Sequence, residues 1–319
     1  MKKNIKQFGN MLMILSIVFL IARIKKMDIQ WSKMLTTAYA FRVILVIVLY
    51  TVLILVSFLP WMKLVGLMSG QKDSVKESGY EFLRVFTKSN IMKYIPGNVF
   101  QYVGRNEIAD ILDLSHLKVA AATITEMIMM AFGAGSLSVL LLGAFTFQYF
   151  YQRLGRNVLF ILAAGILLSC CLLFAFHSQL RSFLSYYFSA VCSKDFLTGV
   201  IFCFFFYIAA FLYGGLLYIF VMKGCGSFEL NHHIIRLLLG TYTLSWVAGY
   251  ITPGAPGGMG IREVIMAIVL GSTGLIEEAV IIQSSLLFRL VTVLGDLAAF
   301  AVSQLLYRIK ERSFGRKKD

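Results

Sequence analysis

Long stretches without a charged residue dominate the chain. Runs that lack Asp, Glu, Lys and Arg cover residues 43–62, 127–152, 157–180, 196–222 and 237–261, and a shorter run covers 7–22. A helix needs roughly 20 apolar residues to cross the hydrocarbon layer of a bilayer, so these runs predict six membrane crossings. The runs do not alternate between apolar and polar positions, as strands of a membrane barrel do. We therefore expect an all-α, polytopic membrane protein.

The C-terminal third of the chain is less regular. Residues 264–276 form an apolar run of about half the required length, and residues 279–307 form a full-length run that contains Arg289 and Asp296. Residues 79–115 are less apolar, and we expect them to lie in the membrane interface or to dip into it. The pattern predicts seven crossings and one half-length segment in a single domain, residues 1–319. That makes about eight membrane-inserted helices, with at least one broken or re-entrant segment.

Composition and charge narrow the class of protein. The chain is 59% apolar and 14% charged, which excludes a soluble globular domain and a disordered chain. A net charge of +14 is compatible with binding to nucleic acid, to an anionic membrane surface or to an anionic lipid. Basic residues flank the apolar runs, eight in residues 63–118 and six in residues 308–318, without the aromatic platform of a nucleic-acid reader. We expect no nucleic-acid partner.

The same basic residues predict topology. Both basic segments are expected to be cytoplasmic, which places the C-terminus of a multi-pass protein in the cytoplasm. Five further basic residues lie between the first two runs, where the opposite side is expected. The orientation of the first helix therefore stays open.

Two stretches combine proline, glycine and arginine. One reads K-Y-I-P-G-N-V-F-Q-Y-V-G-R over residues 93–105, and the other reads T-P-G-A-P-G-G-M-G-I-R-E over residues 252–263. Proline removes a backbone donor and glycine permits positive φ, so each stretch should break a helix. In both, arginine follows the first proline by nine residues. The expected helix-breaking residues are Pro96, Gly97, Pro253, Gly254, Pro256 and Gly257.

The second stretch predicts an anion site. A half-helix that begins near Gly260 would direct its N-terminal amides at the break, and Arg262 adds a full positive charge. Paired interrupted segments in two halves of a chain are typical of transporters built from repeats. Four predicted crossings separate the two stretches, which places both on one side unless one is re-entrant. An inverted repeat is therefore a hypothesis, and chance similarity is its alternative.

Ionisable residues inside apolar segments are the other candidates, because each costs about 2.5–3.5 kcal/mol at a helix centre. One interpretation assigns them to an anionic headgroup and its counter-charges; the alternative is that they pair with one another and hold helices together. The expected headgroup-binding residues are Arg262, Arg289, Arg105, Gly258 and Gly260. The expected counter-charges or proton carriers are Glu263, Glu126 and Asp296. No metal-ligand cluster, nucleotide motif or nucleophile with its base is evident, so we expect no catalytic residue, metal or cofactor.

The two stretches together resemble the lysylphosphatidylglycerol synthase transmembrane region, a flippase-like family of bacterial and archaeal membrane proteins. Its second motif typically reads P-G-G-x-G-x-R-E, which residues 256–263 match throughout, and its first usually has an aromatic residue where Phe100 stands. The resemblance covers residues 12–307. It implies a polytopic protein of the cell inner membrane that moves a lipid between leaflets. Longer relatives carry a soluble aminoacyl-transfer domain; this sequence contains none, so synthase activity is not expected.

The leading hypothesis is a flippase for an anionic phospholipid or a polyprenyl-linked lipid, without enzymatic activity. The alternatives are a membrane-embedded transferase that acts on a lipid-linked glycan, and an accessory partner in surface glycan assembly. The expected partners are membrane lipids, together with glycosyltransferases or other cell-envelope assembly proteins.

Overall fold

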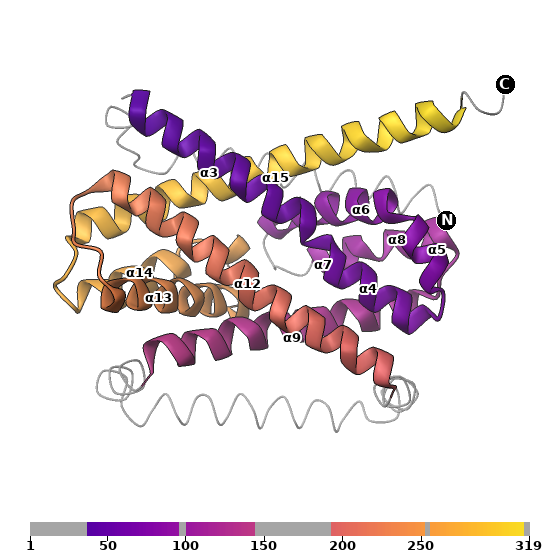
Figure 1. The fold of residues 1–319 in the computed structure, drawn as a ribbon, viewed down its shortest axis with the longest axis horizontal. Coiled ribbons are helices and arrows are strands. Elements are labelled where there is room, and N and C mark those ends of the chain that lie inside the picture. The colour runs from indigo at the N-terminus through magenta and orange to yellow at the C-terminus, as the bar shows by residue number, and fades with distance from the viewer. Residues whose placement is uncertain (1–36, 96–99, 144–192, 253–255, 316–319) are drawn as a thin grey trace.

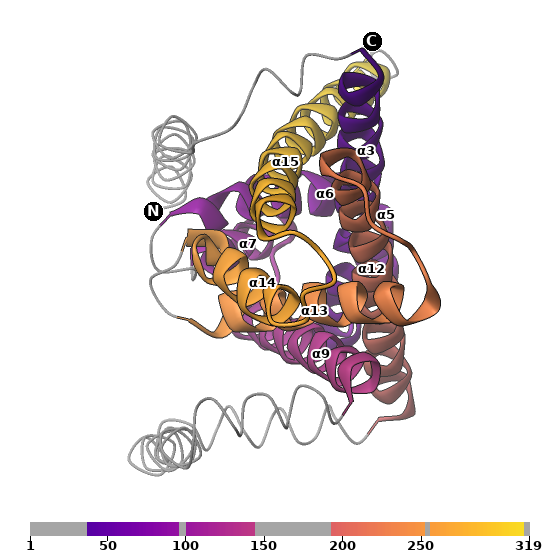
Figure 2. The same cartoon turned by 90° about the vertical axis from the view of Figure 1, so that its left-hand side faces the viewer.

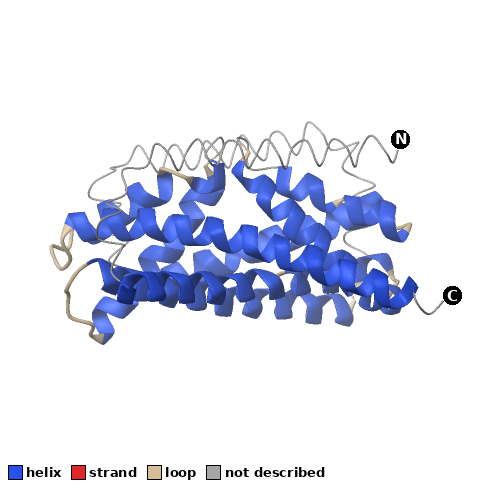
Figure 3. Cartoon of the chain, turned by 90° about the horizontal axis from the view of Figure 1, so that it is seen from above, coloured by secondary structure: helices blue, strands red, loops and turns tan. Residues whose placement is uncertain are grey.

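The computed structural model describes residues 37–95, 100–143, 193–252 and 256–315. Within these ranges every regular element is a helix, which confirms the all-α prediction there (Figure 3). The predicted crossings at 7–22 and 157–180 lie outside the described residues. So do Pro96, Gly97, Pro253 and Gly254.

The helices occur in two blocks along the chain. The first block contains α3 (Thr37–Val56), α4 (Phe58–Ser69), α5 (Lys72–Glu77), α6 (Gly79–Ile91), η1 (Met92–Tyr94), α7 (Phe100–Arg105), α8 (Glu107–Leu112) and α9 (His116–Leu142). The second contains α12 (Lys194–Cys225), α13 (His232–Ile251), η2 (Pro256–Gly258), α14 (Ile261–Gly271) and α15 (Glu278–Gly315). The long helices run roughly along the long axis of the molecule (Figure 1). Seen from the end, α13 and α14 lie between α9 and α15, in agreement with the contacts among them (Figure 2).

Five helical stretches in the described part are long and apolar enough to cross a membrane. They are Tyr39–Ser69, His116–Leu142, Lys194–Cys225, His232–Ile251 and Glu278–Ser313. The runs at 196–222 and 279–307 are therefore confirmed as single helices. The described part of the run at 127–152 belongs to α9. The total of about eight stays a prediction.

The exposed side chains of helix α12 show why the sequences of these helices contain no polar stripe. One face of α12 is exposed and carries Leu197, Ile201 and Phe205, while another face is buried and carries Tyr207 and Tyr218. Apolar side chains thus cover the outward face as well as most of the buried one, unlike a water-soluble helix, whose outward face is polar. An outward apolar face is stable in lipid but would be an aggregation site in water.

The predicted span at 43–62 is not one straight helix. A turn at Ser57 separates α3 from α4, three residues before Pro60. Proline has no N–H, and its ring clashes with the carbonyl four residues earlier, which interrupts the helix there. The hydroxyl of Ser57 donates to the carbonyl of Leu53 at 2.7 Å. The kink places Tyr50 and Ser57 on the wall of the same cavity, described below.

Both Pro-Gly stretches end a helix, as predicted. Ile95 and Thr252 directly precede the prolines and adopt extended conformations, with φ/ψ of −75°/137° and −74°/114°. Proline disfavours helical geometry in the residue before it, which explains both ends. The crossing predicted over residues 237–261 was wrong at its C-terminal end. Helix α13 ends at Ile251, and the elements that follow are η2 and α14.

Segment 79–115 is buried more deeply than a helix that lies on an interface would be. The C-terminal half of α6 is enclosed, including the polar residues Lys88, Ser89 and Asn90. It packs against α15. This packing places Tyr94 and Ile95, at the start of the first Pro-Gly stretch, inside the helix bundle.

Candidate functional site

The two Pro-Gly stretches lie side by side, although 157 residues separate their first prolines. The ring of Tyr94 in η1 lies 3.5 Å from where a Cβ on Gly257 of η2 would stand. The hydroxyl of Tyr102 in α7 donates to the hydroxyl of Tyr250 in α13 at 3.1 Å. The stretches that the sequence singles out therefore form one structural site.

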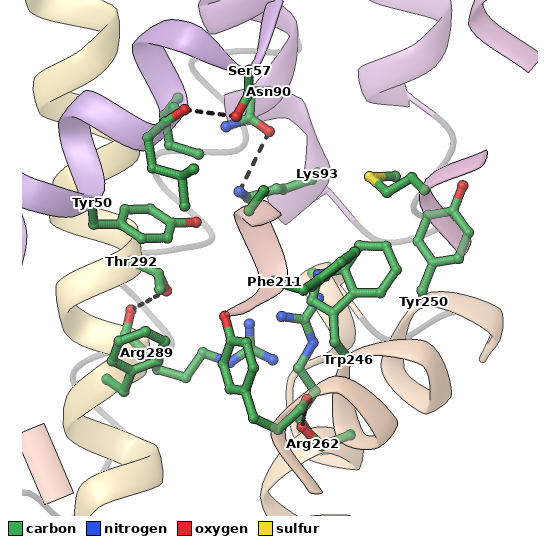
Figure 4. Close-up of a pocket in the computed structure, with 18 of the residues that line it drawn as sticks. Tyr50, Ser57, Asn90, Lys93, Phe211, Trp246, Tyr250, Arg262, Arg289 and Thr292 are labelled. Atoms are coloured by element: carbon green, nitrogen blue, oxygen red, sulfur yellow. Dashed lines mark hydrogen bonds between the residues drawn. The ribbon is translucent and has the colours of Figure 1, made fainter. Parts of the chain in front are cut away.

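A cavity of about 180 Å³ lies beside this contact. Residues from α3, α6, α7, α9, α12, α13, α14 and α15 line it, together with residues of η1 and η2 (Figure 4). Such a volume holds several water molecules or a small polar group. Arg105, Arg262, Arg289 and Glu263 from the predicted set all reach its wall.

Arg262 and Arg289 direct their guanidinium groups into the same part of the cavity (Figure 4). Arg289 Nε donates to Glu263 Oε1 at 2.9 Å, and its second terminal nitrogen is buried with no hydrogen-bond partner in the described residues. Arg262 Nε is also buried without a partner there, and its guanidinium lies 5.5 Å from the centre of the Trp246 ring. Unsatisfied buried donors are costly, so these two arginines are set up to bind an acceptor.

Glu263 connects the start of α14 to α15. Its Oε2 accepts the backbone N–H of Gly260 at 2.7 Å, while its Oε1 accepts from Arg289. The carboxylate therefore caps the helix N-terminus from within and neutralises part of its positive potential. The backbone amide of Gly260, which was expected to bind the headgroup, is therefore already hydrogen-bonded to Glu263.

Asp296 anchors the first stretch to α15. Its carboxylate is fully buried and accepts from Asn90 Nδ2 at 2.8 Å and from Tyr94 Oη at 2.5 Å. Lys93 Nζ lies 2.7 Å from Asp296 Oδ2 and reaches the cavity wall. Asp296 thus acts as a counter-charge, and its partner Lys93 lies in the first stretch.

Arg105 and Glu126 form a third ion pair, between α7 and α9. Both side chains are almost completely buried, and the hydroxyl of Tyr207 also donates to Glu126. The Arg105 guanidinium lies 4.5 Å from the centre of the Phe86 ring and 5.4 Å from that of Trp61. This pair holds the first stretch against α9.

The sum of these charges leaves one cation over. Arg105, Arg289 and Lys93 each pair with one carboxylate, namely Glu126, Glu263 and Asp296. Arg262 has no ion pair within the described ranges. The helix-pairing interpretation therefore accounts for six of these seven charges, and Arg262 is the exception.

Sequence reasoning missed most residues that line this cavity, and three of them had a usable signal in the sequence. Lys93 stood in the first stretch but had not been singled out, although its place three residues before Pro96 is a usable signal. Trp246 and Tyr250 line the cavity and stack with ring centres 4.8 Å apart. Their spacing of four residues, just before the second stretch, puts both rings on one helix face and could have pointed to them.

Gly258 is required by close packing rather than by a free amide. Its φ is +72°, and an added Cβ would lie 2.9 Å from Cα of Gly249 and from Nε of Arg262. We expect Gly258→Ala to destabilise the fold by about 1–3 kcal/mol, through positive φ and steric overlap. Thermal unfolding in detergent measures this.

The control for Gly258 is Gly135→Ala. Gly135 lies within α9 with open space around its added Cβ. Alanine is the better helix former, so this variant should be as stable as the parent or slightly more so. Equal melting temperatures for both variants would contradict the packing role of Gly258.

Comparison with known proteins identifies no relative. No protein-family model matches the chain, and no match is found among curated proteins or solved structures.

Proposed function

We propose that this chain moves an anionic phospholipid or a polyprenyl-linked lipid between the leaflets of the cell inner membrane, as a flippase-like protein of the family its two motifs resemble. The lipid phosphate binds Arg262 and Arg289 in the cavity beside the two Pro-Gly stretches. The acyl or isoprenoid chains stay in the surrounding lipid.

The uncompensated charge of Arg262 is the observation that carries the proposal. A charged headgroup cannot enter hydrocarbon alone, because desolvation of an isolated ion is prohibitive. A guanidinium offers donors in a fixed fork that fits phosphate oxygens, and it stays charged at any physiological pH. Arg262 and Arg289 each keep one buried nitrogen without a hydrogen-bond partner in the described residues, so each retains a donor where water is scarce.

The proposal includes a re-entrant second stretch. Helix α14 has 11 residues, about 16 Å at 1.5 Å per residue, roughly half of the hydrocarbon thickness. Its outward residues Val264 and Ile268 are apolar and exposed, as a lipid-facing half-helix requires. With the crossings outside the described residues the total reaches about eight membrane-inserted helices. The basic C-terminal segment then faces the cytoplasm.

Transport is supported over the transferase alternative by the state of the carboxylates. A general base needs a carboxylate within reach of its acceptor. Glu126, Glu263 and Asp296 are each held by a cation and by further hydrogen bonds. Proteins of surface glycan assembly remain the expected partners under this proposal.

The test is transbilayer movement in vesicles that contain the purified protein. The probes are fluorescent phosphatidylglycerol and a short-chain polyprenyl phosphate. We expect the parent chain to move at least one probe and Arg262→Gln to slow it at least about tenfold, the equivalent of about 1.4 kcal/mol in the barrier.

Arg236→Gln is the matched control, because Arg236 lies exposed near the start of α13 and the substitution removes the same charge. It should transport as the parent does. Arg262→Lys keeps the charge without the fork and should be intermediate. Transport by a folded Arg262→Gln protein at the parent rate would refute the role of Arg262, and immobility of both probes with the parent chain would refute the proposed function for these lipids.

A further inference from the structure

The wall of the cavity is far more aromatic than the chain as a whole. Eleven of its 28 lining residues are Phe, Tyr or Trp, whereas aromatic residues make up 14% of the sequence. Phe211, Trp246 and Tyr250 form a continuous group: ring centres of Phe211 and Trp246 are 4.7 Å apart, and Trp246 stacks on Tyr250. A phosphate group alone would not pack against aromatic rings.

The aromatic wall adjoins the arginine pair directly. Trp246 contributes its ring both to the aromatic group and, at 5.5 Å, to the guanidinium of Arg262 (Figure 4). A ligand whose phosphate binds Arg262 therefore presents the next group along its headgroup to Trp246.

Three polar groups along the same wall have no hydrogen-bond partner in the part of the chain that the structure describes. Within the described residues no hydrogen bond engages the hydroxyl of Tyr50, the side-chain amide of Gln101 or the indole N–H of Trp246. Figure 4 shows the hydroxyl of Tyr50 directed into the cavity. The Tyr50 hydroxyl and the Gln101 amide can both donate and accept, and the Trp246 indole can donate, which suits a ligand with several hydroxyls.

The charge of the site argues against an organic cation, which is the other kind of ligand that aromatic walls bind. Aromatic cages bind organic cations when no protein cation already lies against their rings and when free carboxylates attract the ligand. Here four cationic side chains reach the cavity wall, and each of the three carboxylates nearby is paired with one of them. A cationic headgroup, such as one that carries an amino acid, is repelled.

We propose that the transported lipid carries a sugar joined through phosphate, with the phosphate on Arg262 and Arg289 and the sugar ring against Trp246 and Tyr250. A pyranose ring presents C–H groups on its faces, which pack on aromatic rings, and hydroxyls at its edges, which take up the free donors and acceptors. This inference rests on the proposed transport function and names its substrate class.

The test compares two probes that differ only in the sugar. One is a short-chain polyprenyl phosphate, and the other is the same chain with a hexose joined through the phosphate. We expect the parent chain to prefer the hexose probe in initial rate at limiting concentration. Trp246→Leu should lower the ratio of hexose to bare phosphate about tenfold, whereas Trp246→Phe, which keeps a ring, should lower it less than about threefold.

The bare phosphate serves as the internal control, because loss of Trp246 also removes a neighbour of Arg262 and lowers both rates. Tyr250→Leu is the second variant: it removes a ring that stacks on Trp246, and it replaces Trp246→Leu if that protein does not fold. It should lower the same ratio.

The outcomes separate the two proposals. If the parent moves the bare phosphate in an Arg262-dependent way but shows no preference for the hexose probe, the sugar inference is wrong and transport stands. The same holds if folded Trp246→Leu and Tyr250→Leu proteins keep the parent ratio, or if lysyl-phosphatidylglycerol is moved faster than either probe. If the parent moves none of these lipids, the transport function itself fails.

Discussion

Replacement of Glu126 by leucine is expected to give the largest loss of stability in detergent among the variants considered. Glu126 is 1% exposed and Arg105 is 5% exposed, so the substitution strands a guanidinium among Trp61, Phe86 and Tyr102. Loss of one partner of a buried ion pair costs about 3–5 kcal/mol. At about 2 °C or more per kcal/mol, the melting temperature should fall by at least about 6 °C.

The double variant Arg105→Met with Glu126→Leu is the control for this mechanism. It removes both charges and keeps comparable side-chain volume, so it should recover much of the loss. Melting is followed by tryptophan fluorescence in a mild detergent. If the double variant melts below Glu126→Leu, the penalty does not come from an unpaired Arg105 charge.

The second large effect is expected at Asp296. Asp296→Leu removes the acceptor of Asn90 and Tyr94 and the counter-charge of Lys93. Hydrogen bonds to a charged group are worth about 1.5–3 kcal/mol each, so the total loss should be about 3 kcal/mol or more. It should stay below that of Glu126→Leu, because the Lys93 side chain is 19% exposed and can be solvated in the cavity.

Two further variants order this effect. Asp296→Asn keeps an oxygen for Asn90 and loses the charge, so its melting temperature should lie between those of the parent and Asp296→Leu. Asp73→Asn, at an exposed carboxylate of α5, should melt as the parent does. Equal loss in Asp296→Asn and Asp73→Asn would contradict the anchoring role of Asp296.

Much of the fold in the described residues follows from local signals in the sequence. An uncharged run predicted α12, a long apolar run predicted α15 despite Arg289 and Asp296, and Pro253 predicted the break after α13, because each signal depends only on neighbouring residues. The kink at Ser57 was not predicted, although Pro60 was visible, since proline in an apolar run can also be tolerated within a membrane helix. Local rules thus locate helices better than they locate kinks.

The pairing within the site could not be predicted. Arg289 and Asp296 are seven residues apart on one helix, but Glu263 binds the first and Lys93 the second. Which partner each one meets depends on how α6, α14 and α15 pack, and a single sequence does not contain that information. For the same reason the aromatic wall was invisible: its rings come from seven helices and converge only in the folded chain.

The two anchors on α15 also have a mechanical consequence. Seven residues separate Arg289 from Asp296, about 10 Å along an unbroken helix at 1.5 Å per residue. Arg289 holds α14 through Glu263, the last residue of the second stretch. Asp296 holds η1 through Tyr94, near the start of the first stretch. A slide or rotation of α15 is therefore transmitted to both sides of the cavity together, and neither stretch can shift alone along α15 without loss of an ion pair. Helix α15 therefore couples the two stretches: a movement of one along the helix requires a movement of the other.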